Sequence, residues 1–150
     1  MSSPPNLIHK LNWFYSLELN QVDLYTAQSK HVKDMYVKKT LKRVAIIEQQ
    51  HVDNIADTIH QYGETPTRLG DIIAPITGKI TGNITGKAGL INLLKANIVL
   101  EKKAMKDYKN FILKSVSDQD LFDLLWDNLI DEDLHTAWFH NKVKELTTQV

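Results

Sequence analysis

The sequence predicts an all-α protein, a four-helix bundle with one long crossover between the second and third helices. Two observations predict this fold. All six glycines and two of the four prolines fall between residues 63 and 89, so helix-breaking residues are rare in the rest of the chain. On both sides of this segment, apolar residues recur at steps of three and four, which is the period of an amphipathic helix.

Four helices account for nearly all residues outside that segment. Their predicted ranges are about 5–31, 36–62, 89–115 and 118–147, with a crossover at 63–88 and a single domain over 1–150. Pro4-Pro5 suits the first turn of a helix, and Ser117 followed by Asp120 resembles a capping box at the start of the last one. The short connections make helices one and two antiparallel, and likewise three and four, whereas the long connection allows helices two and three to run parallel.

The crossover contains a four-residue repeat of the form Ile-Thr-Gly, whose copies begin at Ile76, Ile80 and Ile84. In a helix, these isoleucines would share one side. Because glycine costs about 1 kcal/mol per site in a helix relative to alanine, the favoured interpretation is a poorly helical strap whose isoleucines cover the bundle. The alternative is a close-packing glycine face against a partner or a lipid surface.

The composition excludes several classes of function. The chain has 18 basic and 18 acidic residues, so it has no net positive charge that would attract nucleic acid. The chain has no cysteine, so disulfides, thiolate metal sites and redox thiols are excluded. The N-terminus lacks a signal pattern and no run of 18 apolar residues occurs, so we expect a cytoplasmic protein that does not bind membranes.

Glutamate is scarce, and its positions are unusual. Of the 18 acidic residues, 12 are Asp and six are Glu, although glutamate is the better helix former. Four of the six glutamates nevertheless fall on the apolar stripes near the middle of four different predicted helices: Glu18, Glu48, Glu101 and Glu132. A core is an unfavourable place for carboxylates that lack a partner, so these four residues are candidates for a functional site.

The two halves of the chain repeat the same pattern. Each half contains a core glutamate, a tyrosine seven residues later, and a Glu-x-x-His pair. The residues are Glu18, Tyr25, Glu48 and His51 in the first half, and Glu101, Tyr108, Glu132 and His135 in the second. Chance would produce roughly 0.24 Glu-x-x-His pairs in a chain of this composition, whereas this chain has two, both on core stripes.

This duplicated set predicts a site for two metal ions. Two divalent cations would neutralise four glutamates that otherwise repel one another in a core of low dielectric. Residues at i and i+3 share a helix face, so each Glu-x-x-His pair can offer an oxygen and a nitrogen to neighbouring ions. The mixture of oxygen and nitrogen ligands favours iron, with manganese as the other candidate. A metal-free polar network of glutamate and histidine is the alternative.

The arrangement resembles that of the di-iron carboxylate proteins of the ferritin-like superfamily, over essentially the whole chain from Leu11 onward. Leu11-Asn12, Glu18-Leu19 and Tyr25 are similar to the first helix of bacterioferritins. The seven-residue spacing from glutamate to tyrosine in both halves, with the Gly/Thr-rich approach to the third helix, is more similar to demethoxyubiquinone hydroxylases.

The resemblance implies a role for each residue of the site. By position, Glu18 and His51 would hold one iron, Glu101 and His135 would hold the other, and Glu48 and Glu132 would bridge them. Gln49 stands where bacterioferritins carry a haem-ligating methionine, so no haem is expected. Ala104 stands where rubrerythrins place an additional glutamate, the missing cysteines exclude a rubredoxin centre, and the apolar C-terminal extension of the membrane-bound hydroxylases is absent.

The resemblance also implies a redox function. We expect a ferroxidase, or an enzyme that reduces O2 or hydrogen peroxide, acting in iron handling or oxidative stress with an electron donor of unidentified type. The four core glutamates would be catalytic together with Tyr25. Tyr25 and Tyr108 could hydrogen-bond the ligands or pass electrons, and the alternative is that both are core tyrosines anchored by their hydroxyls. The alternatives are an O2-activating di-iron hydroxylase of a small apolar substrate, and a bundle whose iron is structural or stored. A homo-oligomer, at least a dimer, is expected.

Overall fold

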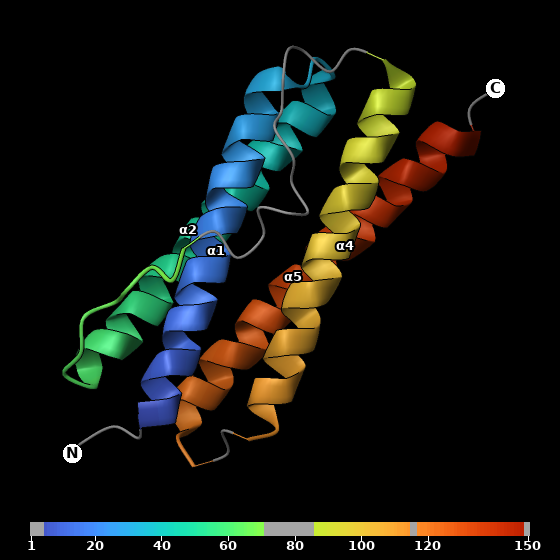
Figure 1. Cartoon of the computed structure of the whole chain (residues 1–150). Coiled ribbons are helices and arrows are strands. Elements are labelled where there is room, and N and C mark those ends of the chain that lie inside the picture. The colour runs from blue at the N-terminus through green and yellow to red at the C-terminus, as the bar shows by residue number, and fades with distance from the viewer. Residues whose placement is uncertain (1–4, 71–85, 115–116, 149–150) are drawn as a thin grey trace. The chain divides into compact units, whose positions relative to one another are not determined.

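The computed structural model describes residues 5–70, 86–114 and 117–148 (Figure 1). These residues contain four α-helices: α1 (Pro5–His31), α2 (Met35–Gln61), α4 (Lys87–Ile112) and α5 (Gln119–Thr148). Each helix end lies within three residues of the predicted one. The isoleucines of the Ile-Thr-Gly repeat lie outside the described residues, so both interpretations of the repeat stay predictions.

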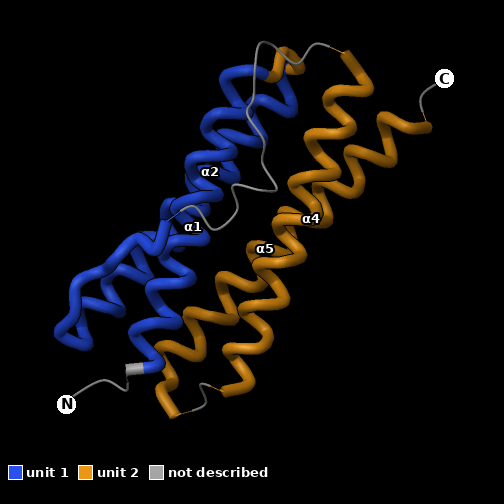
Figure 2. Tube along the Cα trace, in the orientation of Figure 1, with its two compact units in different colours: residues 1–31, 35–80 blue, residues 32–34, 81–150 orange. Residues whose placement is uncertain are grey.

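The chain divides into two compact units, shown in different colours in Figure 2. Unit 1 comprises residues 1–31 and 35–80, and unit 2 comprises residues 32–34 and 81–150. In unit 1, α1 packs against α2, and in unit 2, α4 packs against α5. The connections from His31 to Met35 and from Ile112 to Gln119 are short, so the helices of each pair are antiparallel. Each pair is a helical hairpin.

The predicted apolar stripes form the core of both hairpins. In unit 1, Leu11 and Ile55 are completely buried, and in unit 2, Leu94 and Leu125 are completely buried. Burying a leucine or isoleucine side chain contributes about 1.5–3 kcal/mol, so these stripes hold each pair of helices together. The described ranges contain no helix with the length and apolar character needed to cross a membrane.

Two helix ends have well-defined caps. Gly63 follows α2 with a φ of +80°, a conformation that glycine adopts without steric cost, and the Glu64 N–H donates to the Ile59 carbonyl at 3.2 Å. At the start of α5, the Asp118 carboxylate accepts a hydrogen bond from the Leu121 N–H at 3.1 Å. The cap of α5 is therefore Asp118, not the predicted Ser117, and its negative charge also favours the N-terminal end of the helix dipole.

The segment after α2 is hydrogen-bonded to a polar stripe on α1 that the apolar pattern does not predict. Three buried side chains, one turn apart on α1, contact the backbone of residues 67–70. The hydrogen bonds run from the Thr67 N–H to Asn12 Oδ1 at 2.8 Å, from the Leu69 N–H to Ser16 Oγ at 2.7 Å, and from Asn20 Nδ2 to the Gly70 carbonyl at 3.4 Å. These hydrogen bonds hold the first residues of the crossover against α1.

We expect Ser16→Ala to destabilise the protein by about 1–3 kcal/mol, because it leaves the Leu69 N–H without its acceptor in a partly buried position. Chemical denaturation measures the loss, and amide exchange at Leu69 should become faster. Thr58→Ala is the matched control, because the Thr58 hydroxyl is exposed and donates to the Asn54 carbonyl of its own helix. Equal stability of the two variants would show that the stripe does not hold the crossover.

Candidate metal centre

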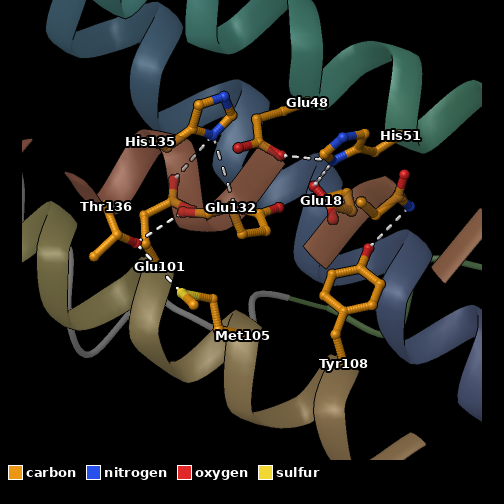
Figure 3. Close-up of polar contacts among 10 residues, drawn as sticks. Glu18, Glu48, His51, Glu101, Met105, Tyr108, Glu132, His135 and Thr136 are labelled. Carbon is orange, nitrogen blue, oxygen red and sulfur yellow. Dashed lines mark hydrogen bonds and ion pairs between the residues drawn. The ribbon is translucent and has the colours of Figure 1, made fainter. Parts of the chain in front are cut away.

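In unit 1, the structure brings together three of the predicted site residues. Glu18 comes from α1, and Glu48 and His51 come from successive turns of α2. His51 Nδ1 lies 3.3 Å from Glu18 Oε2 and 3.2 Å from Glu48 Oε2, as the dashed lines in Figure 3 show. Both carboxylates are completely buried and His51 is nearly so. We call these three residues the first triad.

In unit 2, the equivalent residues form a second triad. Glu101 comes from α4, and Glu132 and His135 come from successive turns of α5. His135 Nδ1 lies 3.7 Å from Glu101 Oε1 and 3.8 Å from Glu132 Oε2 (Figure 3). Both glutamates are completely buried. The same histidine nitrogen therefore faces the same two carboxylates in each unit.

The donor atoms of each triad have the chemistry and the spacing of metal ligands. Within each triad, one ligand atom from every residue lies within 4.8 Å of the others. Two oxygen or nitrogen ligands at about 2.0–2.2 Å from a shared ion, separated by 90–120°, lie about 2.8–3.8 Å apart. The distances from histidine to carboxylate in the first triad fall inside this interval, and those in the second lie at its upper edge. Each triad could therefore hold a metal ion.

The electrostatics of the second triad also favour a bound cation. Burial raises the pKa of Glu101 well above its usual value, and the neighbouring Glu132 carboxylate raises it further, while His135 opposes both effects. A raised pKa means that the charged form of Glu101 is destabilised in the metal-free protein. A divalent cation would reverse this effect, because it favours the ionised carboxylate.

The two repeated tyrosines are completely buried, Tyr25 in α1 and Tyr108 in α4. The Tyr108 hydroxyl accepts a hydrogen bond from Asn128 Nδ2 at 3.3 Å, within unit 2 (Figure 3). Asn128 lies one turn before Glu132, whereas Val44 lies one turn before Glu48 in the first half. The two halves therefore share their triads but differ in the residue that precedes the Glu-x-x-His pair. The catalytic role of Tyr25 stays a prediction.

A second contact in unit 2 involves a residue next to a candidate ligand. The Thr136 hydroxyl donates to the Glu132 carbonyl at 2.8 Å and lies 3.5 Å from the Met105 sulfur (Figure 3). It thus connects the turn of α5 that carries the second triad to α4. Sequence reasoning did not identify Thr136, Asn128 or the α1 stripe. The signal that could have found them is a polar residue at a position where the helical period requires an apolar one.

Comparison with known protein families identifies the domain. The family described as the ferritin-like domain matches residues 8–148, which is nearly the whole chain and includes both triads. No curated protein gives a significant match. The match and the described helices confirm the predicted fold class, a ferritin-like four-helix bundle with a long crossover between the second and third helices. By its sequence, this chain belongs to the ferritin-like domain family.

Proposed function

We propose that the protein is a di-iron redox protein in which the two triads supply the ligands for two iron ions. The observation that carries this proposal is the duplication of one buried arrangement. In each unit a histidine Nδ1 faces two completely buried carboxylates, one from each helix of the hairpin. One buried Glu–His pair is commonly structural, whereas two copies of a three-residue set are difficult to explain without a ligand.

The donor set supports iron or manganese over other metals. Four carboxylates balance the charge of two divalent ions, and two imidazoles add neutral nitrogen donors. Calcium and magnesium prefer oxygen ligands alone, and zinc sites usually contain fewer carboxylates. Nitrogen and oxygen donors together suit iron and manganese. No haem is part of the proposal, because Gln49 follows Glu48 where a methionine would be needed.

The proposed reaction is the oxidation of Fe(II) by O2 or hydrogen peroxide, in iron handling or in the defence against oxidative stress. When bound, iron supplies electrons and Lewis acidity. The protein contributes a dry, fixed set of ligands, because the triad side chains are almost completely buried and sit on helices. Tyr25, two helical turns after Glu18, is proposed to hydrogen-bond a ligand or to pass electrons. A homo-oligomer, an electron donor and a cytoplasmic setting stay predictions of the sequence.

The test is to load the metal-free protein with Fe(II) under anaerobic conditions and then to add O2 or hydrogen peroxide. We expect bound Fe(II) to be oxidised faster than the same concentration of Fe(II) in buffer. The rates with the two oxidants identify the preferred one. If Fe(II) binds but is oxidised no faster than in buffer, the redox proposal is wrong and the site only binds metal. If Fe(II) does not bind, the metal-site proposal is wrong as well.

A further inference from the structure

A stripe of large apolar residues runs along the solvent side of α5. Its members recur at four-residue intervals: Phe122, Trp126, Ile130, Leu134 and Trp138. Trp126, Ile130 and Leu134 are 43–63 % exposed, and the rings of Phe122 and Trp126 meet edge to face with centroids 6.3 Å apart. An isolated exposed apolar side chain is ordinary, whereas a continuous stripe over several turns is typical of an interaction site.

The same side of α5 carries negative charge and no positive charge over most of its length. Residues 119–141 contain no lysine or arginine. The acidic residues outside the second triad are Asp120, Asp123, Asp127, Asp131 and Asp133, and all of them are exposed or half-exposed. We call this combination of apolar and acidic residues the α5 face. Its partner must offer apolar surface together with positive charge.

The first half of α2 has the complementary character. Residues 35–47 contain no acidic residue and four basic ones: Lys38, Lys39, Lys42 and Arg43. Met35, Tyr36 and Ile46 are 51–66 % exposed. At 100° per residue, Met35, Lys39, Lys42, Arg43 and Ile46 lie within an arc of about 100° on the side of α2 away from Glu48. We call this combination of apolar and basic residues the α2 face.

We propose that the α5 face of one copy of the chain docks on the α2 face of a second copy. The lengths agree, because Trp126 to Leu134 spans about 12 Å and Met35 to Ile46 about 16 Å at 1.5 Å per residue. The charges agree as well, since one face is acidic, the other is basic, and the chain as a whole is neutral. Pairing of two α5 faces would instead bring like charges together, which is unfavourable. This proposal does not depend on the redox function.

Docking of two different faces is a heterologous contact, so each copy keeps one face free for a further copy. Such contacts generate rings or larger closed assemblies when the rotation between copies closes. The wild-type chain is therefore expected to form assemblies larger than a dimer at high concentration. Their stability should fall as salt increases, because salt screens exposed charges.

Charge reversal tests this arrangement in the full-length protein. The first variant combines Asp123→Lys with Asp127→Lys and so makes the α5 face basic. The second combines Lys39→Glu with Arg43→Glu and so makes the α2 face acidic. All four positions are exposed, so both variants should fold, which circular dichroism and thermal unfolding check. Asp57→Lys with Glu64→Lys is the matched control, because both residues are exposed and lie beyond the α2 face.

Sedimentation velocity measures the size of the assemblies that each protein forms. We expect wild type and the control to associate, each charge-reversed variant alone to sediment as a monomer, and an equimolar mixture of the two to associate again. The mixture regains association because the basic α5 face of one variant meets the acidic α2 face of the other. A monomeric wild type would overturn the proposal. So would a mixture that stays monomeric, or an α2-face variant that assembles like wild type, which would indicate pairing of α5 faces.

Discussion

Replacing Glu48 by alanine is expected to abolish oxidation of Fe(II) by the protein. Glu48 is completely buried, and its Oε2 lies 3.2 Å from His51 Nδ1, so its loss removes one of three donors from the first triad. Loss of a residue that only supports a ligand lowers metal affinity by about 10- to 100-fold, so loss of a ligand should lower it by at least about 100-fold. The measurements are Fe(II) affinity under anaerobic conditions and the oxidation rate after O2 is added.

Glu64→Ala is the control for this experiment. Glu64 is one of the two glutamates outside the core set and is exposed just after α2, so its loss should leave both quantities unchanged. Glu48→Gln keeps the size of the side chain and separates loss of the ligand from loss of packing. If Glu48→Ala and Glu48→Gln both oxidise Fe(II) at the wild-type rate, Glu48 is not part of the metal site.

Replacing Glu101 by glutamine is expected to have opposite effects on metal binding and on stability. Glutamine lacks the charge that binds a cation, so iron affinity should fall. The metal-free protein should become more stable at neutral pH, because glutamine is uncharged and needs no proton, whereas Glu101 is either protonated or charged at a buried position beside Glu132. A rise in the unfolding midpoint of the metal-free protein measures this gain.

The pH dependence gives this prediction a definite sign. The pKa of Glu101 is raised in the folded protein, so the folded state holds a proton that the unfolded state has released. In the metal-free protein, stability should therefore fall as pH rises from the ordinary glutamate pKa toward the raised one. Glu101→Gln should remove this fall, whereas Glu145→Gln, at an exposed position, should not. Denaturation of the metal-free protein at several pH values measures the free energy of unfolding as a function of pH. The same pH dependence in wild type and Glu101→Gln would contradict the prediction.

The fold is largely predictable because apolar residues recur at helical spacing and nearly all helix-breaking residues fall in one segment of the chain. The apolar stripes place α1, α2, α4 and α5, and the glycine-rich segment separates the two hairpins. The cap of α5 is less predictable, since Ser117 and Asp118 are adjacent and both can accept a hydrogen bond from a helix N-terminus. Only the structure identifies Asp118 as the residue that does so.

The members of the two triads are also predictable, because four scarce glutamates lie on core stripes and each Glu-x-x-His pair shares one helix face. The hydrogen bonds around them are not. Asn128 and Tyr108 are 20 residues apart and belong to different helices, so no local pattern connects them. Asn12, Ser16 and Asn20 contact residues that lie 50 to 55 positions later, in a segment that has no regular structure from which a contact could be inferred.

Metal content is the measurement that tests the central claim most directly. Protein expressed with excess iron and purified without chelators should contain two metal ions per chain, predominantly iron, as measured by elemental analysis against protein concentration. Glu48→Ala and Glu101→Gln should each contain fewer ions, and Glu64→Ala should match wild type. Fewer than two ions per chain in the wild-type protein would contradict the proposal that both triads bind metal.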